Sequence, residues 1–596
     1  MNKIPETAGE VEHRADAVAA ARGRRQFDVL LSGGVVVDVC TGELRAADVG
    51  IVGPWIASVH RPGSRRDAAE VLDVTGRYVA PGFIDMHVHF ESSMLTPASF
   101  ASAVIPHGTT TAFCDPHELA NVAGLDGVRY AVEASRDLPL RFVFQVPSCV
   151  PPVPGLEYSG ADFLGEQVGE MLTWPEVAGV AEVMDMRGVL NRSPRMVSIV
   201  EAGLSSGKLV EGHAFGLTGP ELQAYLAAGI SSDHEITSAD GALERLRAGM
   251  TVELRGGIEH ILPEVVAELN SLPTIPTNMT LCTDDVFAHV LLAEGSVDHL
   301  IRRLIGYGLA PVSAIRLATL NAAYRLGRTD LGVVGAGRRA DLVVLGDLVE
   351  VTIEDVLTAG RHVASGGRML HRVGSVGGVP PTGTTKLAPM QPDDFRLPVP
   401  GVHSGTAKVR GISGVRFTRL SEFEVDVRDG FAVPPPGCVV QVAVHRHGRV
   451  PAVPRVAFVS EWGRWEGAVA TTVSHDTHNL VVFGREPRDM AIAANAVIDS
   501  GGGVAVAATG ELWALVELPI AGLLSYHEPE EVARQQRRLE AAAKEVADFS
   551  PLYHRPLFQV MAASLACNPG PHLTDVGLAD GTSGEMLETV VSASSR

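Results

Sequence analysis

The sequence has 596 residues, and its 49 basic against 70 acidic side chains give a formal net charge of 49 − 70 = −21. Domains usually hold roughly 100–200 residues and barrels up to about 250, so this length predicts about three structural units. Hydrophobic residues make up 46% and charged residues 20%, which is ordinary for a globular enzyme and argues against disorder. The acidic excess argues against binding to nucleic acid or to an anionic membrane, both of which favour Lys and Arg.

Residues 1–26 are polar and of mixed charge, so we expect a poorly ordered extension there and no signal peptide. The chain has no run of about 18 apolar residues, so no membrane span is predicted. Its six cysteines include no CxxC pair, which indicates neither a disulfide framework nor a zinc ribbon. Together these features predict a soluble protein of the reducing cytoplasm.

Residues 28–79 alternate short β-branched runs with Gly, Pro and Asp, a pattern typical of a small antiparallel sheet or half-sandwich. The same pattern returns at 332–347 and at 360–370. Because these segments flank a long middle region, we predict one small composite β domain made of residues 27–79 and 331–376.

Residues 80–330 alternate apolar, strand-like runs with helical stretches. Candidate strands cover 79–89, 109–115, 141–147, 177–184, 208–213, 229–233, 251–255 and 278–284. Candidate helices between them include 118–137, 162–172, 240–249, 258–269 and 285–305. Eight strands alternating with helices over about 250 residues predict an α/β fold of the (β/α)8 TIM-barrel type.

Residues 377–401 are rich in Pro and Gly and predict a linker or an extended covering strand. Residues 402–596 are expected to form an additional C-terminal α+β domain. Within it, residues 528–549 are highly charged and helical in pattern, which favours a solvated amphipathic helix.

The motif PGFIDMHVHFESS, residues 81–93, carries the first chemical signal. On a strand, residues i and i+2 point the same way, so His87 and His89 are expected to project together into the barrel. Two imidazoles at the C-terminal end of a strand can chelate one divalent ion. Taken alone, the pair is more simply read as two hydrogen-bonded core histidines.

Further metal-capable residues favour the metal-binding interpretation of the pair. They lie at the ends of later candidate strands: Glu182, His213, His234 and Asp284. The active sites of TIM barrels lie at the C-terminal ends of the strands. Any one of these residues alone would more simply form a salt bridge or cap a helix. Metal-capable side chains at the ends of five strands instead predict a metal site.

This pattern, together with ADLVVLGD in the flanking β segments, resembles the amidohydrolase superfamily. More narrowly, HGTTTAFCDPHE, AEVMDMRGVLN, EGHAFGLTG, SSDHEITS, LCTDD and TVSHDTHNLVVFG resemble the bacterial adenine deaminase family, over about residues 28–590. The resemblance implies hydrolytic deamination of adenine to hypoxanthine and ammonia, a purine-salvage reaction, by a metal-bound hydroxide in a binuclear site. It also implies the free base, rather than the nucleoside, as substrate.

A carbamylated lysine bridges the two ions in many two-metal amidohydrolases. Between Pro81 and Asp330 the only lysine is Lys208, at the start of strand five, so no lysine bridge is expected. The resemblance implies that Glu182 takes its place. The predicted ligands are His87, His89 and Asp284 for the first ion, Glu182 for both, and His213 and His234 for the second. This ligation suits Mn(II), Fe(II) or Zn(II), and the resemblance favours Mn(II) or Fe(II).

We predict two catalytic residues. Asp284, touching both ion and hydroxide, is the candidate base, and Glu235, beside His234, is the candidate proton donor. Hydrogen bonding to that ligand is the alternative role of Glu235. Candidate purine-binding residues follow strands one and two at the barrel mouth: Glu91, Ser92, Asp115 and His117. These residues could instead hold an extra ion, and for Asp115 capping of the following helix is a further alternative.

The motif SHDTHN offers His475 and His478, for which a structural role and a role at the barrel mouth both stay open. The expected partner is a small-molecule purine base, and the superfamily resemblance suggests a homodimer or a larger homo-oligomer. Two other functions stay open: a cyclic-amide or N-acyl hydrolase of the same superfamily, and a non-catalytic binding protein that retains the barrel.

Overall fold

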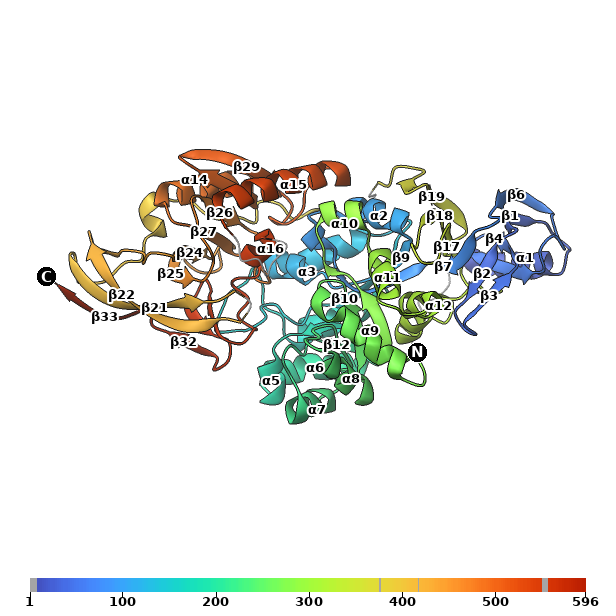
Figure 1. Cartoon of the computed structure of the whole chain (residues 1–596), viewed down its shortest axis with the longest axis horizontal. Helices are drawn as coiled ribbons and strands as arrows, with labels where there is room; N and C mark the ends of the chain where they lie inside the picture. Colours follow the sequence, from blue (N-terminus) through green and yellow to red (C-terminus); the bar gives the residue numbers. More distant parts are fainter. Residues whose placement is uncertain (1–7, 375–376, 416, 549–555, 596) are drawn as a thin grey trace.

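The computed structural model describes residues 8–374, 377–415, 417–548 and 556–595. The chain is elongated, with the N-terminal strands at one end, the barrel in the middle and a C-terminal sheet at the other end (Figure 1). Among the described residues, no helix is both long and apolar enough to cross a lipid bilayer.

Strands from before and after the barrel share one seven-stranded sheet, in the order β20-β19-β18-β17-β7-β2-β3. Those before it are β2 (Val35–Asp38), β3 (Glu43–Ala46) and β7 (Tyr78–Pro81). Those after it are β17 (Leu342–Leu345), β18 (Ile353–Thr358), β19 (Arg361–Ser365) and β20 (Arg368–Met369). The antiparallel pairing of β7 with β17 joins the two groups, so the sheet is composite.

A second sheet, in the order β5-β4-β1-β6, lies at the N-terminal end of the chain. Its strands are β1 (Phe27–Ser32), β4 (Asp48–Val52), β5 (Trp55–His60) and β6 (Ala68–Asp73). Strand β1 pairs antiparallel with β4 and parallel with β6. The sequence pattern predicts an antiparallel sheet or a half-sandwich, and the parallel pairing of β1 with β6 departs from the first of these.

The extension over residues 1–26 was expected to be poorly ordered, but most of it forms helix α1 (Ala8–Ala21). Ala20 is buried, and the Arg14 guanidinium lies 3.7 Å from the centre of the Trp55 ring. Small alanine side chains let the helix lie close to the sheet, and the cation–π contact holds its polar side. The first seven residues lie outside the described part of the chain.

Eight parallel strands form the barrel, as predicted, in the orders β12-β11-β10-β9-β8-β16 and β13-β14-β15. They are β8 (Phe83–His89), β9 (Thr109–Cys114), β10 (Arg141–Val146), β11 (Val177–Val183), β12 (Leu209–Gly212), β13 (Ser232–Asp233), β14 (Thr251–Arg255), β15 (Met279–Cys282) and β16 (Asp284–Asp285). Strands β15 and β16 are two parts of one strand, interrupted at Thr283. Strand β16 closes the barrel by pairing in parallel with β8.

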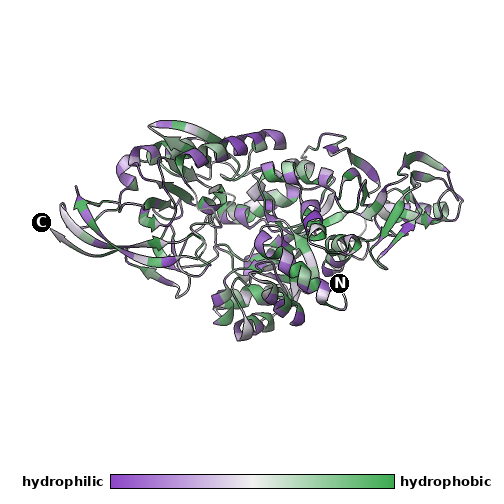
Figure 2. Ribbon diagram, in the orientation of Figure 1, coloured by the Kyte–Doolittle hydropathy of each residue, from purple (hydrophilic) through white to green (hydrophobic). Residues whose placement is uncertain are grey.

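Helices cover the outside of the barrel, so its strands are apolar along most of their length (Figure 2). These helices include α2 (Pro97–Val104), α3 (His117–Ala134), α4 (Gly165–Met171), α6 (Pro194–Ser206), α7 (Gly219–Ala227), α8 (Ala239–Arg247), α9 (Leu262–Ser271), α10 (Ala288–Glu294) and α11 (Val297–Gly306). The single helix predicted over 285–305 is thus two helices. Gly295, with a φ of 112°, ends the first of them.

The C-terminal unit is built on a ten-stranded sheet. Its strands are β21 (Gly405–Ser413), β22 (Arg419–Arg428), β23 (Phe431–Ala432), β24 (Val439–Val444), β25 (Arg455–Ser460), β26 (Ala468–Thr471), β27 (Leu480–Gly484), β28 (Gly503–Ala508), β29 (Glu511–Glu517) and β33 (Val590–Ser595). Most neighbours are antiparallel. Helices α14 (Pro487–Asp499), α15 (Pro529–Val546) and α16 (Pro556–Met561) complete this α+β unit.

Two segments of this unit are more buried than their sequence patterns predicted. Helix α15 was expected to be solvated, but it lies between β29 and the barrel helix α10 and buries Val532 and Leu539 (Figure 1). The stretch 377–401, expected to be a linker or a covering strand, packs Phe395 into the core beside α14.

Hydrogen bonds attach the C-terminal unit to the barrel. Gln536 on α15 accepts from the backbone N–H of His289 at 3.0 Å and donates to the carbonyl of Ser93 at 3.3 Å. Asp575 accepts from the backbone N–H of Tyr158 at 3.1 Å. These bonds tie the C-terminal unit to loops that follow barrel strands β8, β10 and β16, at the mouth of the barrel.

Glu157, beside this interface, gives a test of stability against pH. Burial raises the pKa of its carboxyl well above the usual 4.5, despite the hydrogen bond from the Val153 N–H. The unfolded chain releases this proton near pH 4.5, whereas the folded protein retains it. The unfolded state then binds fewer protons, so stability falls as pH rises above that value, by roughly 1.4 kcal/mol per pH unit.

In Glu157→Gln the side chain cannot ionise, so this loss of stability is absent. Melting temperatures of the variant and the unmodified protein, measured from about pH 4 to about pH 8, should diverge. The variant is expected to be increasingly the more stable of the two toward the alkaline end. Parallel curves would show that Glu157 ionises normally in the folded protein.

Candidate metal centre

The two histidines of the HxH motif lie at the end of β8 and project to the same side. His87 Nε2 and His89 Nε2 are 3.0 Å apart, and both rings are buried. The Nδ1–H of His89 donates to the backbone carbonyl of Asp115 at 3.0 Å. In the neutral ring this bond leaves Nε2 of His89 without a proton and directs its lone pair into the barrel, as a metal ligand requires.

Glu182, at the end of β11, lies between two pairs of imidazoles. Its Oε1 is 3.2 Å from His89 Nε2 and 3.7 Å from His87 Nε2. Its Oε2 is 2.7 Å from His213 Nδ1 and 3.2 Å from His234 Nε2. One carboxylate oxygen therefore faces each pair, which is the arrangement that a bridging ligand needs.

The charge on Glu182 governs the electrostatics of this centre. Burial raises the pKa of its carboxyl, but the hydrogen bonds from His213 and His234 outweigh burial and hold that pKa well below its usual range. Burial alone would lower the pKa of His213. The hydrogen bond to the Glu182 carboxylate outweighs burial and raises that pKa to about 9. A buried anion of this kind draws cations, either protons or metal ions, to the surrounding rings.

Asp284 begins the short strand β16 with a left-handed φ of 60°, and its two oxygens face different groups. Oδ1 lies 3.4 Å from His89 Nε2 and 3.8 Å from His87 Nε2. Oδ2 is ion-paired with Arg255, whose other terminal nitrogen lies 2.8 Å from Glu235 Oε1. Asp284 and Glu235 are therefore joined through one guanidinium.

Arg255 was not among the residues predicted from the sequence, although the predicted strand 251–255 ends on it. Its signal was a charged side chain at the C-terminal end of a barrel strand, the place where functional residues gather. Burial raises the pKa of the Asp284 carboxyl, but the Arg255 charge outweighs burial and holds that pKa well below its usual range.

The capping role considered for Asp115 is wrong. Helix α3 begins after Pro116 with no side-chain cap, and Asp115 Oδ2 instead lies 2.8 Å from His117 Nδ1. His117 Nδ1 is also 3.4 Å from Glu182 Oε1, and its Nε2 is 3.6 Å from Asp476 Oδ1. His117 thus connects the bridging position to the C-terminal unit.

Glu91 and Ser92, both buried after β8, contact different partners. Glu91 Oε1 accepts from the backbone N–H of Leu119 at 3.3 Å, and burial raises the pKa of its carboxyl to about 8. Ser92 Oγ lies 2.5 Å from Glu118 Oε1 and 2.5 Å from Asp285 Oδ1. Ser92 therefore lies within a group of acidic side chains, whereas Glu91 contacts the start of α3.

Lys208 lies at the opposite end of the barrel. Its Nζ donates to the carbonyls of Leu172 at 2.6 Å and Val177 at 2.7 Å, and Val177 begins β11. The Nζ of Lys208 thus lies at the start of β11 and not at the strand ends where the predicted ligands gather.

The six predicted ligands fit divalent ions. Each is at most 5% exposed, and overlapping sets of their ligand atoms lie within 4.8 Å of one another. One set is His87, His234 and Asp284, and another is Glu182, His213 and His234. Imidazole and carboxylate donors that converge in a buried place suit Mn(II), Fe(II) and Zn(II).

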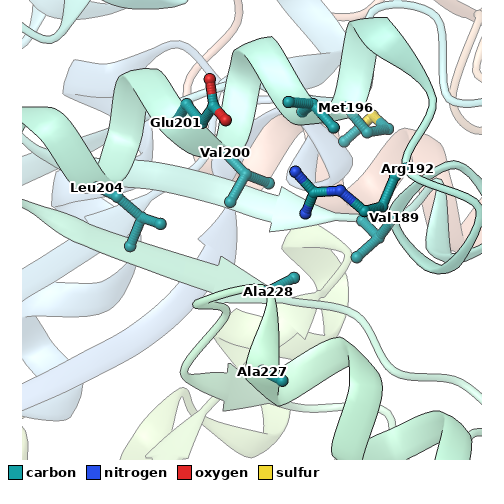
Figure 3. Close-up of a pocket in the computed structure, with 9 residues that line it drawn as sticks. Val189, Arg192, Met196, Val200, Glu201, Leu204, Ala227 and Ala228 are labelled. Carbon is teal, nitrogen blue, oxygen red and sulfur yellow. The ribbon is translucent and has the colours of Figure 1, made fainter.

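A cavity outside the barrel is separate from this centre. It lies between α6 and α7, and Figure 3 shows Val200, Leu204 and Ala228 facing it, with Arg192 and Glu201 at its edges. None of its lining residues belongs to the metal-capable set.

A (β/α)8 barrel that gathers buried imidazoles and carboxylates at the C-terminal ends of its strands defines a metal-dependent amidohydrolase. Residues 78–363 match the Amidohydrolase family, and residues 416–585 match the Adenine deaminase C-terminal domain. Over 97% of its length the chain is 53% identical to "Adenine deaminase 2" of Rhizobium meliloti (strain 1021), covering 97% of that protein.

It is also 53% identical to "Adenine deaminase" of Klebsiella pneumoniae subsp. pneumoniae, covering 96% of that protein, and 37% identical to "Adenine deaminase" of Desulfatibacillum aliphaticivorans, covering 97%. The chain belongs to the adenine deaminase family. Membership of the amidohydrolases implies a divalent metal ion in the active site.

Replacing the central carboxylate tests the ligand set. Glu182→Gln keeps the side-chain shape but removes the charge that holds the imidazoles together, so affinity for Mn(II) should fall by about tenfold or more. Metal content after dialysis against metal-free buffer gives the readout. Glu201→Gln, on the exposed face of α6, is the matched control. Unchanged metal content in Glu182→Gln would remove Glu182 from the ligands.

Proposed function

We propose that the protein hydrolyses adenine to hypoxanthine and ammonia at the barrel mouth. The observation that carries this proposal is the buried Glu182 carboxylate between two imidazole pairs, with Asp284 and Glu235 joined beside it by Arg255. Relatives at 53% identity over almost the whole chain bear the name adenine deaminase. A cyclic-amide or N-acyl hydrolase is not favoured by any contact in this centre.

The same residues support a binuclear site. The first ion is assigned to His87, His89 and Asp284, the second to His213 and His234, and Glu182 to both. Mn(II) or Fe(II) is the proposed metal, with Zn(II) also suited to the donors. When bound, such ions lower the pKa of water to about 7 and so make hydroxide available at neutral pH.

The reaction adds a water oxygen to C6 of adenine, breaks the C6–N bond and releases ammonia. Both protons of the water must leave its oxygen, the first as the oxygen attacks C6 and the second as it becomes a carbonyl, while ring N1 and the leaving nitrogen each gain one. Asp284 Oδ1 faces the imidazoles while Arg255 holds Oδ2, so Oδ1 is placed to accept the water proton. Glu235, on the other side of Arg255, is placed to hold and deliver a proton to the purine.

We infer that the enzyme acts in the cytoplasm, on the free purine base, as a homodimer or a larger homo-oligomer. The acidic charge and the absence of CxxC pairs support the first inference, and the superfamily resemblance supports the others.

Ammonia release is the direct test. Protein purified in the presence of Mn(II) should release ammonia from adenine and very little from adenosine, and His87→Ala should release none. Removal of the metal with a chelator should abolish turnover, and Mn(II) should restore it. A metal-loaded protein that turns over another cyclic amide but not adenine would overturn the substrate assignment.

Replacing the proposed proton donor separates catalysis from metal binding. Glu235→Gln should lower kcat about 10²- to 10⁴-fold with little change in KM, the loss expected for one general acid–base group. Metal content should match that of the unmodified protein. If metal content falls in parallel with kcat, Glu235 acts only by supporting a ligand.

A further inference from the structure

A second group of buried, chemically capable side chains lies beside the metal centre and has no part in the mechanism above. It consists of Glu118, in the first turn of α3, with His475 and His478, in the loop between β26 and β27. All three are at most 5% exposed, and one ligand atom from each lies within 4.8 Å of the others. The barrel supplies the carboxylate and the C-terminal unit supplies the imidazoles.

Within the described chain, these side chains lack hydrogen-bond partners at the atoms that face one another. Glu118 Oε2 and His478 Nε2 are both unpaired, and they are 3.8 Å apart, too far for a hydrogen bond to each other. Leaving a buried polar atom unpaired costs about 1–3 kcal/mol. A donor and an acceptor held side by side in this way are therefore suited to a ligand that satisfies both.

The local backbone sets the hydrogen on His478. The N–H of Ser474 donates to His478 Nδ1 at 3.2 Å, so Nδ1 carries a lone pair, and in the neutral ring the hydrogen lies on Nε2. Burial and the charge of His475 lower the pKa of His478 well below its usual value, which keeps the ring neutral. His478 Nε2 therefore acts as a donor.

This tautomer decides between two ligands that the group could take. A divalent ion needs a lone pair on each ligating nitrogen, and the protonated Nε2 of His478 offers none. Glu118 offers an acceptor and His478 offers a donor beside it. A planar heterocycle matches them if one edge carries an N–H next to an unprotonated ring nitrogen. The purine N9–H and N3 form such an edge.

The group also lies in the right place relative to the metal centre. Ligand atoms of Asp285 and His89 lie within 4.8 Å of each other, and Asp285 Oδ1 is 2.5 Å from Ser92 Oγ. The same hydroxyl is 2.5 Å from Glu118 Oε1. The Ser92–Asp285 pair thus connects the two groups, which places them at neighbouring positions, as C6 and N3 lie across the six-membered ring of adenine.

We propose that Glu118 and His478 bind the N3–N9 edge of the purine, with Glu118 accepting from N9–H and His478 donating to N3. This inference rests on the proposed deamination of adenine and deepens it. The barrel then supplies the reacting end of the pocket, and the C-terminal unit supplies part of the recognition end. A ribose at N9 removes the N–H and meets the Glu118 carboxylate, so the subsite selects the free base.

Substrate analogues test the subsite in the unmodified, Mn(II)-loaded enzyme. 9-Methyladenine lacks the N9 hydrogen, and 3-deazaadenine lacks N3. The enzyme should bind each analogue at least about tenfold more weakly than it binds adenine. Competition constants are compared because ring substitution also alters the reactivity of C6. If 9-methyladenine binds as well as adenine, the proposal is overturned, whether or not any variant folds.

Crossing the analogues with two variants assigns each contact. In Glu118→Ala, binding of adenine should weaken about 10- to 100-fold, and the preference for adenine over 9-methyladenine should disappear, while the preference over 3-deazaadenine remains. His478→Ala should show the opposite pattern. Glu545→Gln, at an exposed position of α15, should preserve both preferences. Unchanged preferences in both variants would contradict the subsite.

Metal analysis tests the alternative that this group binds a divalent ion and not the purine. The unmodified enzyme and both variants should hold the same number of ions per chain. A third ion that is lost in Glu118→Ala would replace the purine subsite with a cation site. If the unmodified protein releases no ammonia from adenine, the proposed function itself fails, a result distinct from active enzyme with unchanged analogue preferences.

Discussion

The organisation of the barrel mouth depends on one buried anion, the carboxylate of Glu182. Burying a charge costs several kcal/mol unless it is paired and hydrogen-bonded, and here each oxygen faces two imidazoles. The scaffold fixes those rings in turn. The hydroxyl of Tyr225 accepts from the backbone N–H of His213 at 3.1 Å and donates to the carbonyl of Val183 at 2.6 Å, so it joins the ends of two neighbouring strands.

Residues whose position follows from local rules were accessible to sequence reasoning. Strand periodicity places His87 and His89 on one side, and the barrel rule places Glu182 and Asp284 at strand ends. Arg255 was not recognised because its importance comes from its position between Asp284, on β16, and Glu235, just after β13. Pairing between strands depends on barrel closure, and no short motif encodes it.

The contribution of the C-terminal unit was out of reach for a related reason. An amphipathic pattern shows that α15 has an apolar face, but it does not show whether solvent or another helix covers that face. Nor does the motif SHDTHN reveal that His478 meets Glu118 of the barrel. Contacts between units far apart in sequence depend on how two surfaces fit, which is a property of the folded chain.

The composite sheet has a consequence for the order in which the chain folds during its synthesis. Strand β7 leaves the ribosome before the barrel, whereas its partner β17 follows only after the last barrel helix. Until then β7 has an unpaired edge on that side, which is a place where nascent chains can associate wrongly. The sheet is therefore completed only once the barrel has been made, and its closure fastens the first barrel strand to the end of the barrel segment.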